Sequence, residues 1–139
     1  MRQEQKEITV MTSGPGLYEF SDAARSFTHE AGLSMGQLTA YCRHTSASLV
    51  IQENADPDVQ RDLLAFFNRL VPDGDALFVH TMEGPDDMPA HVKSALTQTS
   101  ITIPIVRSAL ALGTWQGLYL FEHRRKPHAR NIVLHALGE

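Results

Sequence analysis

The chain of 139 residues contains one cysteine, Cys42, so no disulfide can form within it. A lone cysteine suits a reducing compartment. Because Cys42 lies in a strand-like stretch, we expect a small core residue rather than a nucleophile. The first residues lack the apolar segment of a signal peptide, and no later run approaches the length of a membrane span. These absences predict a cytoplasmic protein that does not enter a membrane.

An excess of basic residues is also missing, since the formal net charge is −4. This charge argues against nonspecific binding to nucleic acid, which needs a positive field. The sequence has no G-x-x-x-x-G-K-[ST] or G-x-G-x-x-G element, so the usual nucleotide-binding loops are excluded. The sequence also lacks the HxxxH and HExxH spacings, with which one helix can supply two zinc ligands. A metal site would therefore have to be assembled by the fold or between subunits.

What the chain does contain is the composition of an ordinary globular domain. Hydrophobic residues make up 42% and charged residues 20%, and the length fits one domain, residues 1–139. Periodicity and capping residues predict a helix over residues 21–31, another over 57–70 behind Asp56 and Pro57, and a further helix start near Pro89. Alternation and turn residues predict strands over residues 8–11, 17–20, 36–43, 45–52, 76–81, 101–106, 118–124 and 131–137.

The stretch from residue 38 to residue 54 carries the most unusual side chains. If residues 45–52 form one strand, His44, Ser46, Ser48 and Val50 share a face. Such a row could hold a metal, a phosphate or a polar substrate, and it leads to Glu53. The alternative is an edge strand whose polar face meets water. Whether the chain bends at residues 43–44 is left open by the sequence.

A second concentration of polar groups is the acidic loop over residues 83–93. We expect Asp86 to cap the following helix or to face solvent. Asp87 could equally cap the helix or join His91 as a cation ligand. Farther on, the glycines at 113 and 117 suggest backbone held close to a ligand or to another strand, and the basic cluster at 124–130 could be an exposed hairpin tip.

Several of these motifs occur in an order that closely resembles the YjbQ-type family, also described as secondary thiamine-phosphate synthase enzymes. The resemblance covers essentially the whole chain. It depends on the segments 44–49, 53–54, 56–57, 86–93, 112–117 and 122–124 together with Arg130. One departure is Arg107-Ser108, where the family usually has a glycine before the Leu-Gly-Thr-Trp-Gln element.

The resemblance implies an α+β fold, a single-domain two-sheet β-sandwich of about seven strands and two main helices in the order ββαββαβββ. It also implies a homotrimer. The implied activity is a weak thiamine-phosphate synthesis, in which a pyrimidine-methyl diphosphate is joined to a thiazole phosphate and pyrophosphate is released. A metal-dependent hydrolase of unknown substrate and a noncatalytic trimer that binds a metal or metabolite remain alternatives.

The same resemblance and the residue chemistry together give the candidate site. Small phosphorylated substrates and a divalent cation, zinc or magnesium, are the expected ligands. The metal ligands are expected to be His44, His80 and His91. The catalytic residues are expected to be His44, Glu53, Asp87 and His91. The substrate-binding residues are expected to be Thr45, Ser46, Ser48, Asn54, Thr114, Trp115, Gln116, Arg124 and Arg130, with Trp115 stacking on a ring and the two arginines meeting phosphate.

Overall fold

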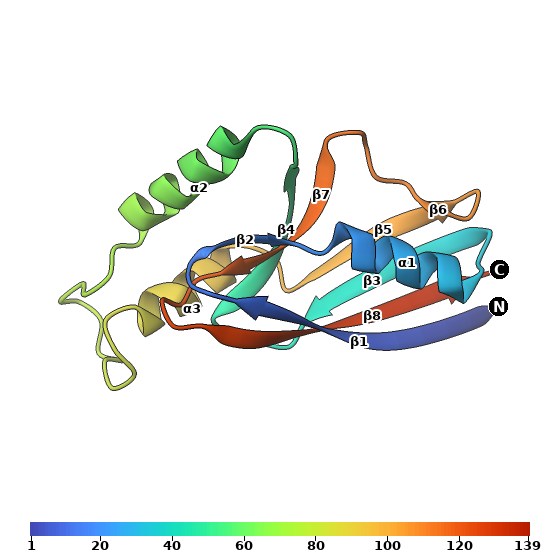
Figure 1. The fold of residues 1–139 in the computed structure, drawn as a ribbon. Coiled ribbons are helices and arrows are strands. Elements are labelled where there is room, and N and C mark those ends of the chain that lie inside the picture. Colours follow the sequence, from blue (N-terminus) through green and yellow to red (C-terminus); the bar gives the residue numbers. More distant parts are fainter.

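A computed structural model describes residues 1–139, and its fold is α+β (Figure 1). The elements are β1 (Arg2–Thr12), β2 (Gly16–Glu19), α1 (Ser21–Ala31), β3 (Met35–Cys42), β4 (Ala47–Glu53), α2 (Pro57–Leu70), α3 (Asp87–Leu96), β5 (Ser100–Val106), β6 (Ala109–Leu110), β7 (Gln116–Glu122) and β8 (His128–Gly138). The α+β class is confirmed. The expected order ββαββαβββ is wrong in detail, because α3 is a full helix and β6 forms a short additional strand.

The strands form two antiparallel sheets. One has the order β1-β8-β3-β5-β6 and the other the order β2-β7-β4. Along β5 and β8, buried and more exposed residues alternate, as expected when one face of an antiparallel sheet covers the core. The smaller sheet and α1 contribute the remaining core residues, among them Leu49, Leu120 and Phe27. Cys42 is 1% exposed within this core, so its predicted place is confirmed.

Between β3 and β4 the chain bends over residues 43–46 and passes from the larger sheet to the smaller one. The predicted continuous strand over residues 45–52 is therefore wrong at its start. His44 and Ser46 lie in the bend, and only Ser48 and Val50 of the expected polar row belong to β4. The change of sheet brings the bend close to α3, which contacts β4.

The helix α2 begins as its capping residues predict. The side chain of Asp56 accepts a hydrogen bond from the N–H of Asp58, and Pro57 occupies the first turn. The predicted strand over residues 76–81 is wrong. This segment forms turns around Asp75, whose side chain accepts from the N–H of Leu77, and no strand lies beside it to pair with.

The departure at Arg107-Ser108 does not prevent a hairpin. Both residues have positive φ, 51° and 65°, in the two-residue connection between β5 and β6. This geometry is typical of a type I′ turn, in which glycine and asparagine are preferred. The hydrogen bond from the N–H of Ser108 to the carbonyl of Ser34 (3.0 Å) ties the turn to the start of β3. No helix in the protein is long and apolar enough to cross a bilayer.

Candidate metal centre and adjoining cavity

The first two turns of α3 and the loop before it gather two histidines around one carboxylate. Asp87 Oδ2 lies 2.7 Å from His80 Nε2 and 3.0 Å from His91 Nε2. The three ligand atoms all lie within 4.8 Å of one another. Asp87 and His91 face each other because they are four residues apart on one helix. Two of the three predicted metal ligands, His80 and His91, are thus brought together with Asp87.

Arginine contacts hold the carboxylate of Asp87 in place. Arg124 Nη1 donates to Asp87 Oδ1 over 2.7 Å, and its Nε donates to Asp86 Oδ2 over 3.1 Å. Burial alone would raise the pKa of Asp87, but the hydrogen bond from His80 and the charges of His91 and Arg124 outweigh burial and lower it. The carboxylate is therefore ionised at neutral pH. Asp86 occupies the N-cap position of α3, as one of the two expectations had it, but its side chain makes no capping hydrogen bond. The residue is 7% exposed, so the other expectation, that it faces solvent, is wrong.

The backbone fixes the protonation of His91. Its Nδ1 lies 2.9 Å from the carbonyl oxygen of Thr45, which can only accept, so Nδ1 carries a proton. The other nitrogen, Nε2, faces the Asp87 carboxylate, which also only accepts when ionised. A second proton on His91 or a cation shared with Asp87 would satisfy this contact. Donation of the outer ring nitrogen to a carbonyl is the arrangement commonly found around metal-bound histidines.

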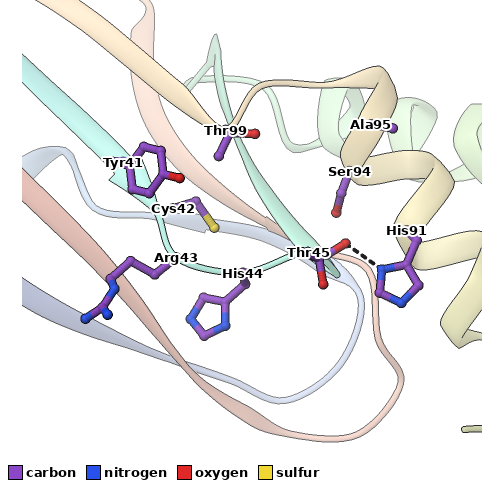
Figure 2. Close-up of a pocket in the computed structure, with 9 residues that line it drawn as sticks. All are labelled: Tyr41, Cys42, Arg43, His44, Thr45, His91, Ser94, Ala95 and Thr99. Atoms are coloured by element: carbon purple, nitrogen blue, oxygen red, sulfur yellow. Dashed lines mark hydrogen bonds between the residues drawn. The ribbon is translucent and has the colours of Figure 1, made fainter.

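Beside this cluster lies a cavity of about 590 Å³, shown in Figure 2. Its lining residues come from the end of β3, the bend, α3 and the connection from α3 to β5: Tyr41, Cys42, Arg43, His44, Thr45, His91, Ser94, Ala95 and Thr99. His91 belongs to both the cluster and the cavity. The volume lies within the usual range of small-molecule sites. The cavity could therefore hold a ligand next to the cluster.

His44 lines this cavity but does not join the cluster. Its Nε2 accepts a hydrogen bond from the backbone N–H of Asn131 over 2.8 Å. Burial, followed by the charge of Arg130, lowers the pKa of His44 and favours the neutral ring. With Nε2 occupied, the remaining nitrogen carries the proton and offers no lone pair. Within one chain, the expected place of His44 among the metal ligands is wrong.

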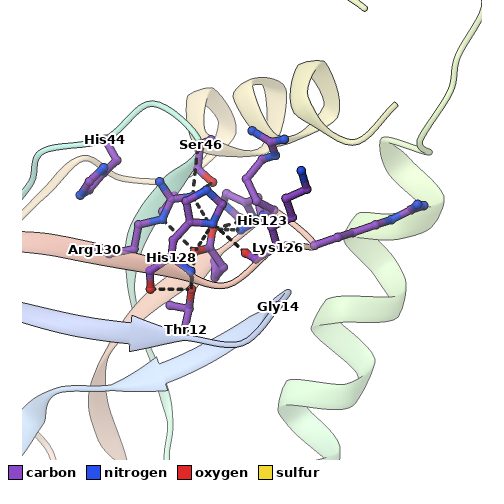
Figure 3. A network of polar contacts seen from close by, with 12 residues as sticks. Thr12, Gly14, His44, Ser46, His123, Lys126, His128 and Arg130 are labelled. Atoms are coloured by element: carbon purple, nitrogen blue, oxygen red, sulfur yellow. Dashed lines mark hydrogen bonds and ion pairs between the residues drawn. The ribbon is translucent and has the colours of Figure 1, made fainter. Parts of the chain in front are cut away.

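Two predicted substrate residues, Ser46 and Arg130, instead belong to a buried ionic network (Figure 3). Arg130 is 4% exposed and binds Glu122 through Nε (2.8 Å) and Nη2 (2.6 Å). Its Nη2 also donates to Ser46 Oγ, and Thr12 donates to Glu122 Oε1 over 2.7 Å. Burial alone would raise the pKa of Glu122, but these hydrogen bonds lower it. Through Nε and Nη2, the guanidinium joins β7, β8 and the bend.

The next hydroxyl, Ser48, is also turned inward. Ser48 is 1% exposed, and its Oγ lies 2.9 Å from His123 Nε2 and 2.6 Å from Thr97 Oγ1. Burial lowers the pKa of His123 to about 3, so the ring is neutral at physiological pH. Ser48 therefore faces the interior between β4, β7 and the end of α3, and not the cavity of Figure 2.

The remaining predicted residues gather at the opposite end of β4. The N–H of Asn54 donates to the carbonyl of Trp115 over 3.0 Å, and Glu53 pairs with Gln116 in the sheet register. Trp115 is 63% exposed. A Cβ added at Gly117 would lie 2.8 Å from Glu19 and 3.2 Å from Asn54, so packing within the chain explains that glycine. Glu53, Asn54, Thr114, Trp115 and Gln116 are therefore separated from the His80–Asp87–His91 cluster within one chain.

Three buried polar residues were not predicted from the sequence. In the sequence, Glu122 and His123 stand out only as part of a motif, and Lys93 only as part of the acidic loop. All three are at most 5% exposed. For two of them the sequence contains a signal, since Glu122 and His123 interrupt or end an apolar strand. A sequence alone, however, does not show which of the two strand faces turns inward.

Fold and site together define a class of small α+β proteins, in which two antiparallel sheets carry a His-Asp-His cluster at the start of a helix. The chain belongs to the UPF0047 family: the family model described as "UPF0047 protein YjbQ-like" matches residues 6–139. The UPF0047 protein sll1880 of Synechocystis is 50% identical over 138 residues, which cover 99% of this chain and 94% of that protein. The UPF0047 protein YjbQ of Escherichia coli O157:H7 is 38% identical and covers 97% and 98%.

Solved structures agree with this assignment. An uncharacterised YjbQ/UPF0047 protein from Clostridium acetobutylicum is similar with a TM-score of 0.87 and 32% identity, covering 95% of this chain and 99% of that one. The hypothetical protein APE1520 from Aeropyrum pernix K1 is similar with a TM-score of 0.89 and 28% identity, covering 98% and 99%. The family that the sequence resemblance implied is thus confirmed, as is an α+β fold with two antiparallel sheets.

Proposed function

We propose that the protein is a small-molecule enzyme that holds a divalent cation at His80, Asp87 and His91 and acts on a phosphorylated substrate. One observation carries the proposal: Asp87 Oδ2 faces both Nε2 atoms, while the carbonyl of Thr45 fixes the proton of His91 on its other nitrogen. Two imidazoles and one carboxylate favour zinc over magnesium, which prefers oxygen ligands and retains water.

The donor set leaves room for a substrate. Three protein ligands with an open position are typical of catalytic zinc sites, whereas structural sites are closed by a fourth protein ligand. The bound cation would supply Lewis acidity toward a phosphate oxygen. Asp87 and the two histidines hold it, Arg124 orients Asp87 from the other carboxylate oxygen, and the 590 Å³ cavity beside His91 receives the substrate.

The reaction we propose is the one that the family resemblance implies, a weak thiamine-phosphate synthesis. Departure of a diphosphate requires positive charge close to the leaving oxygens. The cation site meets this requirement better than the predicted arginines, because Arg124 and Arg130 are already paired with Asp86, Asp87 and Glu122. The single cysteine favours a reducing compartment, and we place the activity in the cytoplasm.

Metal analysis and turnover by the same purified protein test the proposal. We expect about one zinc per chain, and loss of at least tenfold in both zinc affinity and product formation for His91→Ala and His80→Ala. His135→Ala is the matched control, because His135 lies on β8 outside the cluster and its only side-chain hydrogen bond is to Gln3. Stoichiometric zinc without turnover of phosphorylated substrates would favour a binding protein, and turnover that is unchanged in His91→Ala would reject this site.

We also infer a homotrimer, as the resemblance implies. The loop before α3 exposes Leu77, Val79 and Met82 by 87%, 97% and 98%. Apolar side chains gathered on one exposed loop commonly mark a protein contact. His80 lies in this loop, so a neighbouring chain that covers it would also lie close to the cluster. Light scattering is expected to give three times the chain mass, and a mass of 15.4 kDa would reject the trimer.

A further inference from the structure

A second cavity, of about 340 Å³, lies on the other flank of α3 and is lined without any hydrophobic residue. It is bounded by the end of α2, by α3 and by the connection from β7 to β8. Its lining residues are Pro15, Asn68, Pro72, Asp73, Lys93, His123 and Arg125. None of the residues of the His80–Asp87–His91 cluster lines it. The cavity is at the small end of the range found for ligand sites.

Lys93 brings an incompletely paired positive charge to this cavity. The residue is 5% exposed, and its Nζ donates to Asn68 Oδ1 over 3.0 Å. An ammonium has three donors, so two of them have no acceptor in the chain. The nearby carboxylate of Asp73 is paired with Arg125. Lys93 therefore has a neutral acceptor but no carboxylate at ion-pair distance, and burying a charge without a counter-ion is costly, which indicates that an anion belongs here.

His123 also lines this cavity, and one nitrogen of its ring has no partner. The residue is 3% exposed, and its Nε2 contacts Ser48. Its Nδ1 is buried and has no hydrogen-bond partner, a property shared with only one other side-chain atom of the chain, Ser94 Oγ. A buried polar atom left without a partner costs about 1–3 kcal/mol. When the Ser48 hydroxyl donates to Nε2, Nδ1 carries the ring proton and is a donor.

We propose that this cavity binds a small oxyanion, inorganic phosphate or the phosphate group of a small phosphorylated molecule. Lys93 Nζ, His123 Nδ1 and the guanidinium of Arg125 supply donors, and oxyanions accept several hydrogen bonds at once. Lys93 follows Asp87 by six residues, or roughly 9 Å along the helix axis. If the cavity binds the phosphate group of the substrate, this inference rests on the proposed function. If it binds inorganic phosphate, the inference stands without that function.

Titration calorimetry with inorganic phosphate tests the site. The protein is kept metal-free by a chelator in the buffer, and chloride at matched ionic strength is the reference. We expect saturable binding, weakened at least tenfold, or about 1.4 kcal/mol, by Lys93→Met. Lys126→Met is the matched control: it removes a lysine from the exposed β7–β8 connection outside the lining, and phosphate affinity should change less than twofold. Absence of saturable binding, or equal losses in the two variants, would overturn the proposal.

Two further measurements keep the test decisive if Lys93→Met does not fold. Arg125 is exposed, so Arg125→Gln should fold and still weaken phosphate binding several-fold. In wild-type protein with ¹⁵N-labelled histidine, phosphate should shift the Nδ1 signal of His123, and an unmoved signal would contradict the site. Phosphate binding without zinc binding would reject only the metal-dependent function. Zinc-dependent turnover without phosphate binding at Lys93 would reject only this inference.

Discussion

Two buried carboxylates of this protein each pair with an arginine, yet their remaining contacts differ. The Glu122 side chain is fully buried, and its oxygens accept hydrogen bonds from Arg130, from the hydroxyl of Thr12 and from backbone N–H groups. His128 Nδ1 lies 3.7 Å from Glu122 Oε1, beyond hydrogen-bond distance, and contacts the carbonyl oxygen of Lys126 instead. Asp87 is nearly as buried, with a side chain 2% exposed, and one oxygen meets Arg124. Its other oxygen faces two imidazole nitrogens, which can change their protons or bind a cation.

The difference shows that burial beside an arginine does not by itself mark a functional site. A carboxylate whose acceptor positions are all filled by fixed donors stabilises one arrangement of the chain. A carboxylate whose partners are imidazoles keeps a site that exchanges protons or metal. By this criterion Glu122 and Arg130 hold β7, β8 and the bend together, and Asp87 belongs to the chemistry.

The largest expected effect is on stability and concerns Glu122. Glu122→Gln keeps the shape of the side chain but leaves the buried guanidinium of Arg130 without its counter-ion. Breaking one partner of a buried ion pair costs about 3–5 kcal/mol, and we expect a loss of this size in the free energy of unfolding. Urea denaturation followed by circular dichroism measures it.

Glu7→Gln is the control, because Glu7 pairs with Arg43 at the surface, where the two side chains are 44% and 57% exposed. Exposed ion pairs contribute about 0–1 kcal/mol. Similar losses in the two variants would show that the Glu122–Arg130 contact is not the clamp inferred from its burial.

Next in size is the effect of Asp87→Asn on zinc affinity. Arg124 keeps its ion pair with Asp86, so the fold should be destabilised less than by Glu122→Gln, which leaves Arg130 without a carboxylate partner. The ligand charge is lost, and we expect zinc affinity to fall on the order of a hundredfold, or about 2.7 kcal/mol. Competition with a chromophoric chelator gives the affinity. Unchanged affinity would remove Asp87 from the ligand set.

Most of the fold could be predicted from the sequence because it depends on local signals. Asp56 and Pro57 begin α2, and the alternation over 101–106 gives β5. The segment around Leu77 misled because residues 76–79 form a short continuous apolar run typical of a strand, although they belong to neither sheet. The homotrimer and the identity of the reaction remain predictions.

The candidate site was predicted less completely because it depends on long-range contacts. His80 and His91 were paired correctly by residue type, but the bend at 43–46 directs Nε2 of His44 toward Asn131. Glu53 and Trp115 lie at the other end of β4 because the strand places its ends far apart. The role of Lys93 depends on Asn68 and His123, which are distant in sequence and were not connected before the fold was known.

At low pH, both carboxylates are expected to lose part of their contribution to stability, and this effect is smaller than those of the substitutions above. The pKa of Glu122 is lowered in the fold from its ordinary value of 4.5, and the pKa of Asp87 from 3.8. In each case the stabilisation is complete above the ordinary value and declines as the pH falls through the lowered one, since the unfolded chain takes up the proton more readily. The melting temperature should therefore decline below about pH 4.5 in the wild type and less steeply in Glu122→Gln. Parallel curves would contradict this assignment.

The smallest effect is expected for His44→Ala, and it decides whether the site is complete within one chain. His44 accepts from the N–H of Asn131, so its loss should cost about 1 kcal/mol of stability. Because His44 is outside the His80–Asp87–His91 cluster, zinc affinity should change less than twofold, compared with the large loss in His91→Ala. His135→Ala should be neutral in both assays. A tenfold loss of zinc affinity in His44→Ala would return this residue to the ligand set. Since Nε2 is occupied within the chain, that result would mean that assembly rearranges the bend or that His44 of one protomer reaches the cluster of its partner.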